Sequence, residues 1–583
     1  MSNYHKQNDF TKDGHIQGRQ EMADWLDDLQ RNPLDFSPDF LHSIEFHLGN
    51  QAAKFIPRLT ECAEQIPTLE ALVSENDFRL NLPRLEKYDG IGRQIDSICF
   101  HPTYLDAGDI VYGTGMMEMM SHPGGLLKAL SLFFLTSHAG EAGHNCPVAC
   151  TAGVIRILSK VDDFEDKAHF WQKLLEPSFR KNFTGAQFLT EVQGGSDVGR
   201  NATRAIEKED GSYSIEGEKW FCSNANAELI LMTARYDSTL EGTRGLGLFL
   251  VPKYLPDGSR NNYTLRRLKE KLGTRTMASA EIDFDGALGI HMGPIGEGFK
   301  LIMQNVLHIS RIYNTFSVCG SGRRALQIAT RYSRHRKAFG KKIANYPLVQ
   351  ENLANIQAEN MALLSSAMRL AADQDRIDLN QKLASDQLLL QRLMANLNKY
   401  VSALWSVQHI HHCIDVLAGN GAIESFSSLP RLLRDSIVCE NWEGTHNTLR
   451  MQVLRDILRY DQDKIYLNFM RERFSKLSNH AVTVELEEHL KVTENLFIQL
   501  RKADTLLQSY LIKKVFDNMC LGHLALCLLE EGLDMFNHMQ NDVKLMALEV
   551  FMNKHIRHTT PRDQEGLNKF AALIDKFNCI EKT

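Results

Sequence analysis

Residues 188–197, FLTEVQGGSD, mark the point at which the character of this 583-residue sequence changes. From residue 20 to about 180, apolar residues recur mainly with helical spacing. After 185 come short apolar or alternating runs, such as EIDFD at 281–285, separated by turn dipeptides such as Asp210-Gly211. From about 297 the helical spacing returns and continues to the end. This pattern predicts helices, a small antiparallel β domain, and then helices again.

The predicted fold class is therefore mainly α with a central small β domain. Within the first helical part, residues 67–77 are expected to form one helix with Pro67 in its first turn, and residues 124–137 a buried helix. Four domains are expected: an N-terminal helical domain (1–184), a central β domain (185–294), a helical bundle (295–458) and a helical C-terminal extension (459–583).

Composition narrows the class of protein. Hydrophobic residues make up 43% of the chain and charged residues 24%, which is ordinary for a globular protein. The formal net charge of −6 gives no global positive field that would recruit nucleic acid. The N-terminus has no apolar core of a signal peptide, and the most apolar stretch, 124–136, is too short to span a membrane. Eleven cysteines without a CxxC pair favour buried thiols in a reducing, cytoplasmic compartment.

Three segments combine residue types that suit a large planar, phosphorylated ligand. In 188–197, hydroxyls at Thr190 and Ser196 flank a Gly-Gly turn, although a plain strand-to-loop junction would look the same. The segment KWFCSN at 219–224 places an aromatic pair beside small polar residues, as a heterocycle needs, or as an ordinary core would. The basic run RHRKAFGKK at 334–342 suits a diphosphate or, equally, a solvated face.

A fourth segment offers a candidate base. After DVLAGNG at 415–421, the sequence NWEGTHN at 441–447 places Glu443 between Trp442 and Gly444. Desolvation there would raise the pKa of the carboxyl group toward the working range of a general base. The alternative is a simple helix start with Thr445 and Asn447 as capping residues.

Six motifs in this order resemble the acyl-CoA dehydrogenases. They are LTEVQGGSD, KWFCSN, KLGTRTMAS at 271–279, RKAFGKKI at 336–343, LAGNG at 417–421 and WEGTHN at 442–447. The motifs HPTY at 101–104 and FLVPKYLPDGSRN at 249–261, with the extra C-terminal helices, resemble the AidB branch, flavoproteins of the bacterial alkylation response. The resemblance implies a helical domain, an antiparallel β-barrel, a helical bundle and a homotetramer.

The resemblance also implies a cofactor, a reaction and a site. Glu443 would remove the α-proton of an acyl-CoA while the β-hydride passes to FAD, and an electron-transfer flavoprotein would accept the electrons in fatty acid metabolism. Ser196, Arg311 and Gly444 would contact the substrate. The FAD contacts would be Leu189, Thr190, Ser196, Phe221, Ser223, Arg336, Phe339, Gly419, Gly421, Thr445 and Asn447, with Arg336 and Phe339 reaching the FAD of a neighbouring subunit.

Some residues depart from the family pattern. Asp415 and Pro347 stand where the family commonly has glutamine, which puts the inter-subunit grip on FAD in question. Val192 and Gln193 replace a proline-glycine pair, which leaves the preferred acyl chain length open.

Two other functions stay open. In the AidB branch the C-terminal extension is associated with DNA, but residues 461–583 hold 16 Lys and Arg against 18 Asp and Glu, a balance of −2, so DNA binding would need a local basic face such as Arg501, Lys502, Lys513 and Lys514. The second open function is a flavoprotein that binds acyl-CoA or fatty acid without turning it over.

No metal site is expected, because His409 and Cys413 lack further ligands at suitable spacing.

Overall fold

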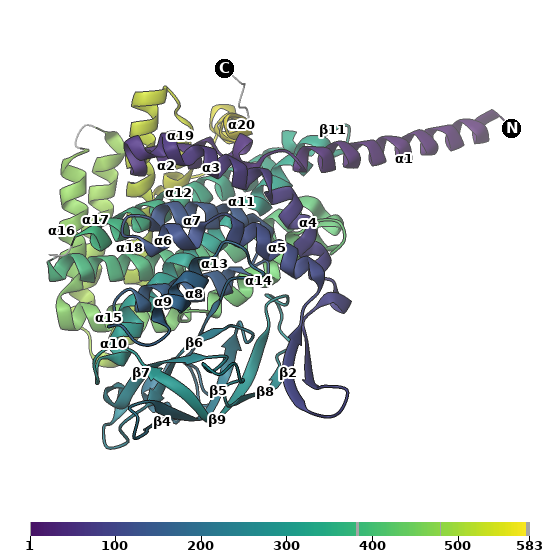
Figure 1. Ribbon diagram of the computed structural model, residues 1–583. Coiled ribbons are helices and arrows are strands. Elements are labelled where there is room, and N and C mark those ends of the chain that lie inside the picture. Colours follow the sequence, from purple (N-terminus) through teal and green to yellow (C-terminus); the bar gives the residue numbers. More distant parts are fainter. Residues whose placement is uncertain (1, 381–383, 478–479, 579–583) are drawn as a thin grey trace.

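The structure is a computed structural model that describes residues 2–380, 384–477 and 480–578. Figure 1 shows a β domain beneath a broad helical body, with the later helices along one side of that body. The predicted fold class, mainly α with one small β domain, is confirmed.

The N-terminal part is largely helical. α7 is buried along its whole length except at Lys128, because its other residues are apolar or small. The predicted helices near 67–77 and 124–137 correspond to α4 and α7. The helices of this part are α1 (Ser2–Leu29), α2 (Pro38–Leu48), α3 (Ala52–Glu64), α4 (Ile66–Asn76), α5 (Pro102–Gly113), α6 (Met116–Ser121), α7 (Leu126–Thr136), α8 (Asn145–Leu158) and α9 (Lys167–Leu175).

One hairpin in this part was not predicted. β1 (Arg84–Tyr88) pairs antiparallel with β2 (Gln94–Cys99), and Asp89 accepts hydrogen bonds from the turn amides of Ile91 and Arg93. β1 has no fully buried residue, so its side chains carry only a weak apolar alternation. A strand held mainly by backbone pairing leaves little periodic signal in the sequence.

The central part is a closed barrel. β6 pairs with β4, β4 with β5, β5 with β9, β9 with β7, and β7 again with β6, which closes the ring. β3 runs parallel to β6, and β4 meets β6 in parallel at one residue pair, so the barrel is mixed and not wholly antiparallel. Side-chain alternation reports burial and not strand direction, which explains the difference. The strands are β3 (Gly185–Phe188), β4 (Arg204–Glu207), β5 (Tyr213–Ser223), β6 (Leu229–Arg235), β7 (Leu246–Pro252), β8 (Tyr263–Leu268) and β9 (Ser279–His291).

Long helices follow the barrel. α11 is buried from Ile309 to Ser333, so it forms the axis of the bundle, and a small hairpin of β10 (Lys337–Ala338) and β11 (Lys341–Lys342) follows its last turn. The helices are α10 (Gly298–Ile302), α11 (His308–His335), α12 (Pro347–Leu379), α13 (Ser385–Leu417), α14 (Leu429–Asn441) and α15 (His446–Tyr460).

The C-terminal extension is helical, as predicted, and one buried carboxylate connects it to the rest. Glu531 of α18 accepts hydrogen bonds from Ser43 of α2 and Ser365 of α12, both at 2.7 Å, and pairs with the buried amine of Lys544. The extension comprises α16 (Gln462–Ser475), α17 (Ala481–Lys502), α18 (Thr505–Met539), α19 (Val543–Met552) and α20 (Gln564–Asn578).

Two further features concern the described residues as a set. Within residues 2–380, 384–477 and 480–578, no helix combines the length and the apolar character that crossing a bilayer requires. The ten cysteines in these ranges are free thiols, and the eleventh, Cys579, lies outside the described residues.

Candidate active site

The candidate base lies in a strained turn between α14 and α15. Glu443 has a φ of 55° and Gly444 a φ of 105°, so both adopt conformations with positive φ, which are unfavourable for a glutamate. Although Glu443 as a whole is partly exposed, its Oε2 is inaccessible and has no hydrogen-bond partner within the described residues. Burial raises the pKa of Glu443 to about 7, against the lowering effect of Arg311 and Lys399. The carboxyl group can therefore accept a proton near neutral pH.

Two buried cations hold this turn by its backbone. Arg311 of α11 donates from Nε to the carbonyl oxygen of Glu443 at 3.1 Å. Lys399 of α13 donates from Nζ to the carbonyl oxygens of Glu440 and Gly444, both at 2.8 Å. These bonds satisfy carbonyls that the end of α14 and the turn would leave without partners, and they fix the position of Glu443.

Burial makes both cationic side chains easier to deprotonate. It lowers the pKa of Arg311 to about 10 and that of Lys399 to about 8, while the Glu443 carboxylate opposes the shift in each case. Arg311 also donates from Nη1 to Asn396 Oδ1 at 2.6 Å. The candidate base therefore lies in a desolvated cluster of opposite charges.

Sequence reasoning missed Lys399. A signal was available, because Asn396 and Lys399 interrupt the apolar stripe of α13 and both are fully buried. A buried lysine that lacks a carboxylate partner in the local sequence must find other acceptors, and here they are carbonyl groups.

The β-domain contacts expected for FAD lie on neighbouring segments. The backbone N–H of Trp220 donates to the carbonyl oxygen of Thr190 at 3.0 Å, which pairs the end of β5 with the segment after β3. Ser223 Oγ lies 3.2 Å from Ser279 Oγ on β9. Leu189 is held through its carbonyl oxygen, which accepts from Asn201 Nδ2 at 2.8 Å. Leu189, Thr190, Phe221 and Ser223 thus belong to one edge of the barrel.

A chain of hydroxyls connects this edge to the Glu443 turn. Ser196 Oγ lies 3.4 Å from Thr448 Oγ1, and Thr448 Oγ1 lies 3.0 Å from Thr445 Oγ1. Thr445 is the N-cap residue of α15, as the capping alternative supposed, but its side chain makes no capping hydrogen bond. Asn447 Oδ1 accepts instead from Arg450 at 3.0 Å.

A thiol pair on α8 lies close enough to Glu443 to feel its charge. Cys146 Sγ and Cys150 Sγ are 3.9 Å apart. The hydrogen bond with Cys146 and burial raise the pKa of the Cys150 thiol well above its usual value, and the Glu443 carboxylate contributes to the rise. The site therefore lies where α8, α11 and the Glu443 turn meet the barrel.

These surfaces fit a flavin. Phe221 is 53% exposed although its neighbour Cys222 is fully buried. The Lys269 amine lies 4.9 Å from the centroid of the Phe221 ring, and the rest of this aromatic surface is open, two residues from the Ser223 hydroxyl. The buried Glu443 Oε2 lacks a partner within the described residues. An isoalloxazine ring needs an apolar face and hydrogen-bonding groups at its edge, and these residues supply both.

The remaining predicted contacts form a second, distant group. Arg336 follows α11, and the Phe339 side chain in the hairpin behind it is 97% exposed. Gly419 and Gly421 lie in the 3-10 segment Ala418–Ala422, where Asn420 Nδ2 donates to the hydroxyl of Tyr332, near the end of α11, at 3.2 Å. Arg311 and Arg336 are 25 positions apart along α11 and its cap, roughly 37 Å at the helical rise per residue. One copy of the chain thus separates the predicted site into two parts.

His409, the histidine on α13 that was considered as a metal ligand, takes part in a network of ion pairs. His409 Nε2 lies 2.7 Å from Glu359 Oε2 on α12, and Glu359 Oε1 lies 2.7 Å from both His555 Nε2 and Lys554 Nζ. Among the described residues, no group of three or more histidine, cysteine or acidic side chains could hold a metal ion. The cluster joins the bundle to the C-terminal extension.

Known protein families match most of the chain. Three family models match the chain: the AidB N-terminal domain (adaptive response protein) at 37–180, the acyl-CoA dehydrogenase middle domain at 186–287, and the acyl-CoA dehydrogenase C-terminal domain at 296–458. The putative acyl-CoA dehydrogenase AidB of Escherichia coli K12 is 31% identical over 409 residues, which cover 68% of this chain and 73% of that protein.

Solved structures share the fold. Caenorhabditis elegans ACDH-11 in complex with C11-CoA superposes with a TM-score of 0.81 at 25% identity, covering 90% of this chain and 91% of that one. An acyl-CoA dehydrogenase complexed with FAD from Bacillus anthracis gives a TM-score of 0.69 at 17% identity, covering 90% and 92%. Together the family models, the Escherichia coli relative and the shared fold establish that the chain belongs to the acyl-CoA dehydrogenase family.

Proposed function

We propose that this protein is an FAD-dependent acyl-CoA dehydrogenase in which Glu443 removes the α-proton of an acyl-CoA thioester. One observation carries the proposal: the turn presents a desolvated carboxyl group whose pKa of about 7 suits a base at neutral pH. The family membership and the exposed Phe221 face beside Ser223 support FAD as the cofactor.

The chemistry requires three functions of the site. The base must take the α-proton, a donor must meet the thioester oxygen as negative charge develops there, and an acceptor must receive the β-hydride. Glu443 would supply the first through its side chain and the second through its backbone N–H. FAD, when bound, supplies the hydride acceptor.

Arg311 and Lys399 set the strength of the base. Burial alone would push the pKa of Glu443 higher, leaving the group protonated at neutral pH, and the two cations oppose that effect. Both side chains bind the backbone carbonyl groups of the turn and not the Glu443 carboxyl group, which leaves that group free for substrate. We regard them as positioning residues that hold and tune Glu443.

Further features belong to the same proposal. A homotetramer, transfer of electrons to an electron-transfer flavoprotein and a role in fatty acid metabolism follow from the family resemblance. A cytoplasmic location is supported by the ten free thiols. The C11-CoA bound to Caenorhabditis elegans ACDH-11 supports acyl-CoA as the ligand class.

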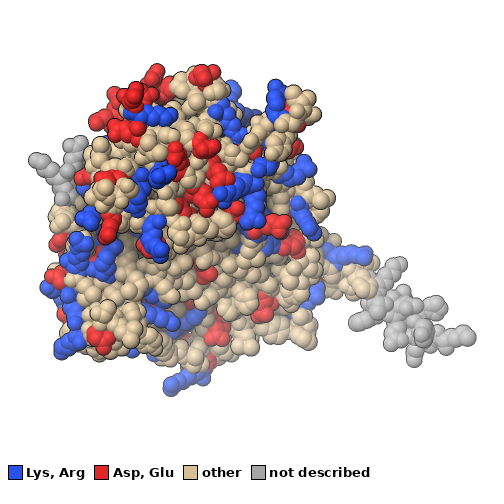
Figure 2. Space-filling view, turned by 90° about the horizontal axis from the view of Figure 1, so that it is seen from below, with Lys and Arg blue, Asp and Glu red and all other residues tan. Residues whose placement is uncertain are grey.

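The DNA-associated alternative has weaker support. Arg501, one member of the candidate basic face, is paired with Asp461 at 2.7 Å and with Asp463 at 2.6 Å. On the face of the molecule shown in Figure 2, acidic and basic side chains are interspersed. Nonspecific DNA binding requires a clustered positive surface.

The proposal is tested by adding acyl-CoAs of short, medium, long and branched chains to the purified, FAD-loaded protein without oxygen. An enzyme loses its visible flavin absorbance with at least one of them. A binding protein shows only a shifted spectrum, and that result with every thioester would replace the enzyme by the non-catalytic acyl-CoA-binding flavoprotein.

A further inference from the structure

Lys271 is a partly buried cation that hydrogen bonds connect to one of the residues expected to contact FAD. Its Nζ donates to Ser279 Oγ at 3.0 Å, and Ser279 Oγ lies 3.2 Å from Ser223 Oγ. Ser223 and Ser279 are directly opposite each other on β5 and β9. Two hydroxyl groups therefore connect the Lys271 amine to the barrel edge on which Ser223 lies.

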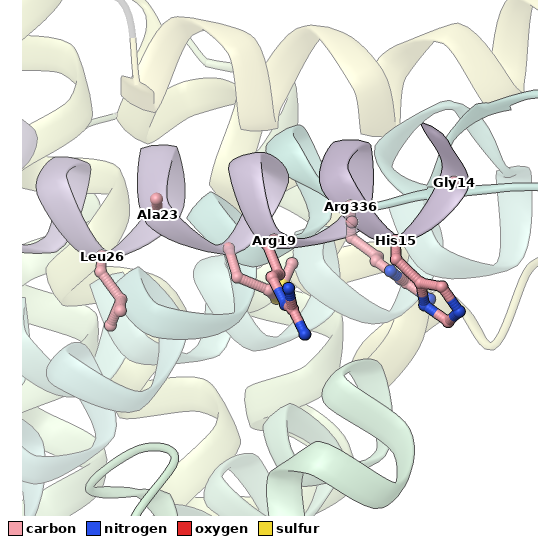
Figure 3. Close-up of a pocket in the computed structure, with 8 residues that line it drawn as sticks. Gly14, His15, Arg19, Ala23, Leu26 and Arg336 are labelled. Carbon is pink, nitrogen blue, oxygen red and sulfur yellow. The ribbon is translucent and has the colours of Figure 1, made fainter. Parts of the chain in front are cut away.

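Other cations near the expected FAD contacts are solvated or paired. Arg19 and Arg336 border a surface pocket at the far end of α11 (Figure 3), where solvent screens their charge from distant groups. Lys269 lies at the same barrel edge as Lys271, but its amine pairs with Glu281 at 2.8 Å. Lys271 is the cation that reaches the edge through a chain of hydroxyl groups.

The loop that carries Lys271 is fastened to the helical part of the site. Lys271 Nζ also donates to the carbonyl oxygen of Met277 at 2.6 Å, within the loop between β8 and β9. The backbone N–H of Thr274 in this loop donates to Asp435 Oδ1 at 2.6 Å. Asp435 belongs to α14, the helix that leads into the Glu443 turn. The loop is therefore held by the helix that positions the candidate base.

The charge of Lys271 fixes the direction of the hydrogen bonds. An ammonium group only donates, so Ser279 Oγ accepts from it and has its own proton left for another acceptor. Ser223 Oγ at 3.2 Å and Met277 Sδ at 3.5 Å are in reach, and oxygen is the stronger acceptor. Met277 Sδ also accepts from the backbone N–H of Asn224 at 3.2 Å. Ser223 thus accepts from Ser279, and its own proton is free for a ligand.

Ser223 presents this proton on the open side of the barrel edge. Ser279 is buried, whereas Ser223 is only partly buried. The edge of an oxidised flavin carries ring nitrogens and carbonyl oxygens that accept hydrogen bonds, and reduction increases the negative charge on the ring. A preorganised row of donors that begins at a cation stabilises such charge.

We propose that Lys271 is a positioning residue for the cofactor: through Ser279 it directs the Ser223 hydroxyl as a donor to the flavin edge, and it thereby makes the bound flavin easier to reduce. The inference rests on the proposed function, which supplies FAD as the hydride acceptor. It gives a role to Lys271 and Ser279, the first and last residues of the motif KLGTRTMAS.

The charge of Lys271 depends on pH. Burial lowers the pKa of Lys271 to about 8, against the raising effects of Glu141, Cys146 and Asp435, the titratable groups whose charges act on it from α14, from α8 and from the segment before α8. Above this pKa the neutral amine can also accept a hydrogen bond, so the direction of the chain is no longer fixed. The effect of Lys271 on the flavin should therefore be largest below this pKa and decrease above it.

The midpoint potential of the bound flavin tests this role without any substrate. In the full-length, FAD-loaded protein, Lys271→Met removes the charge and the donors, whereas Lys271→Arg keeps both. Lys253→Met is the matched control, because Lys253 is also a partly buried barrel lysine, and its Nζ donates to the carbonyl oxygen of Asn226 at 3.0 Å. Each potential is measured well below and well above the pKa of Lys271, and thermal melting verifies folding.

At the lower pH, we expect Lys271→Met to disfavour flavin reduction by tenfold or more, which is about 30 mV for a two-electron couple. Lys253→Met should stay within twofold of the parent protein, and Lys271→Arg should recover most of the loss. At the higher pH, the difference between Lys271→Met and the parent protein should narrow. Equal potentials for these two proteins at the lower pH would overturn the inference.

A second variant tests the hydroxyl chain itself. Ser279→Ala breaks the connection to Ser223 while leaving the Lys271 amine in place, so it should lower the potential in the same direction. This measurement decides the question if Lys271→Met does not fold. An unchanged potential in a folded Ser279→Ala protein would contradict an effect that passes through Ser279.

Adding acyl-CoA to the same parent protein separates this inference from the proposed function. Flavin reduction by acyl-CoA, together with equal potentials in parent and variant, rejects only the role of Lys271. A lower potential in Lys271→Met, together with no reduction of the parent flavin by any acyl-CoA, rejects the dehydrogenase and retains Lys271 as a residue that tunes a flavin. Failure of the parent protein to take up FAD rejects both.

Discussion

Lys399 Nζ lies 2.8 Å from the carbonyl oxygen of Gly444, the residue that follows the candidate base Glu443. This buried amine makes a second bond of the same length to the carbonyl oxygen of Glu440, so it binds the backbone on both sides of Glu443. The position of the base therefore depends on a side chain from α13, far from it in sequence, and its protonation depends on the charge of that side chain.

Replacing Lys399 should change the pH dependence of the reaction. In Lys399→Met the two carbonyls lose their donor, which costs about 1–3 kcal/mol of folding stability. Loss of the positive charge also raises the pKa of Glu443, so the rise in kcat/KM that accompanies deprotonation of the base should move to higher pH.

Lys399→Arg is the matched control, because it keeps the charge. It should retain the pH profile of the parent protein more closely than Lys399→Met, even if stability falls. Identical pH profiles for Lys399→Met and the parent protein would show that Lys399 has only a structural role.

Glu443 should make the folded protein less stable as pH rises. Its pKa in the folded state, about 7, lies above the ordinary glutamate value, so between these two values the unfolded chain has released a proton that the folded chain keeps. Stability is lost across that window and stays lower above pH 7.

Glu443→Gln should remove this penalty. The variant should exceed the parent protein by about 1–2 kcal/mol at pH 8, allowing for the partial exposure of the residue, with the difference shrinking toward pH 5. Denaturant unfolding at both pH values measures it. A difference that grows at the lower pH would contradict the raised pKa.

The hydroxyl of Thr448 should matter for the substrate and little for stability. Thr448→Val removes the contacts with Ser196 and Thr445, which join the loop after β3 to the start of α15. These bonds are exposed, so the free energy of unfolding should change by about 0.5–1 kcal/mol at most. We expect KM for acyl-CoA to rise by roughly threefold to tenfold with a smaller change in kcat. Unchanged KM would separate this loop from substrate binding.

The C-terminal extension should depend strongly on the Lys544–Glu531 pair. Both side chains are fully buried, and the Lys544 amine together with His47 holds the pKa of Glu531 well below its usual value against the effect of burial. Lys544→Met leaves Glu531 without its main counter-charge and should cost about 3–5 kcal/mol.

Lys576→Met, at an exposed ion pair with Asp542, is the control and should cost about 1 kcal/mol or less. Chemical denaturation compares the two variants. Equal losses would show that the buried pair does not hold the extension in place.

The sequence predicted those parts of the fold that rest on burial. The stripes of α12 and α13, the buried helix α7 and the barrel strands all have side chains whose spacing reports which face is covered. It did not predict β1, which has no buried side chain, or the parallel pairing of β3 with β6, because strand direction leaves no periodic pattern.

The candidate site divides in the same way. Glu443 could be proposed from Trp442 and Gly444 beside it, since local sequence already suggests a desolvated turn. Lys399 interrupts the apolar stripe of α13, but its role could not be predicted, because its acceptors are carbonyl groups 41 and 45 positions away, which only the packed bundle brings together. The wide separation of Arg336 from Arg311 became evident only from the structure, in which α11 is one continuous helix between them.

The central claim, that Glu443 is the base, is tested most directly by the rate of flavin reduction in a single anaerobic turnover. The FAD-loaded parent protein and Glu443→Gln are each mixed with an acyl-CoA carrying hydrogen or deuterium at the α-carbon. The parent protein should be reduced rapidly, and more slowly with the deuterated substrate, whereas the variant should bind the thioester but keep its flavin oxidised. Reduction of the variant at the parent rate would contradict the assignment of Glu443 as the base.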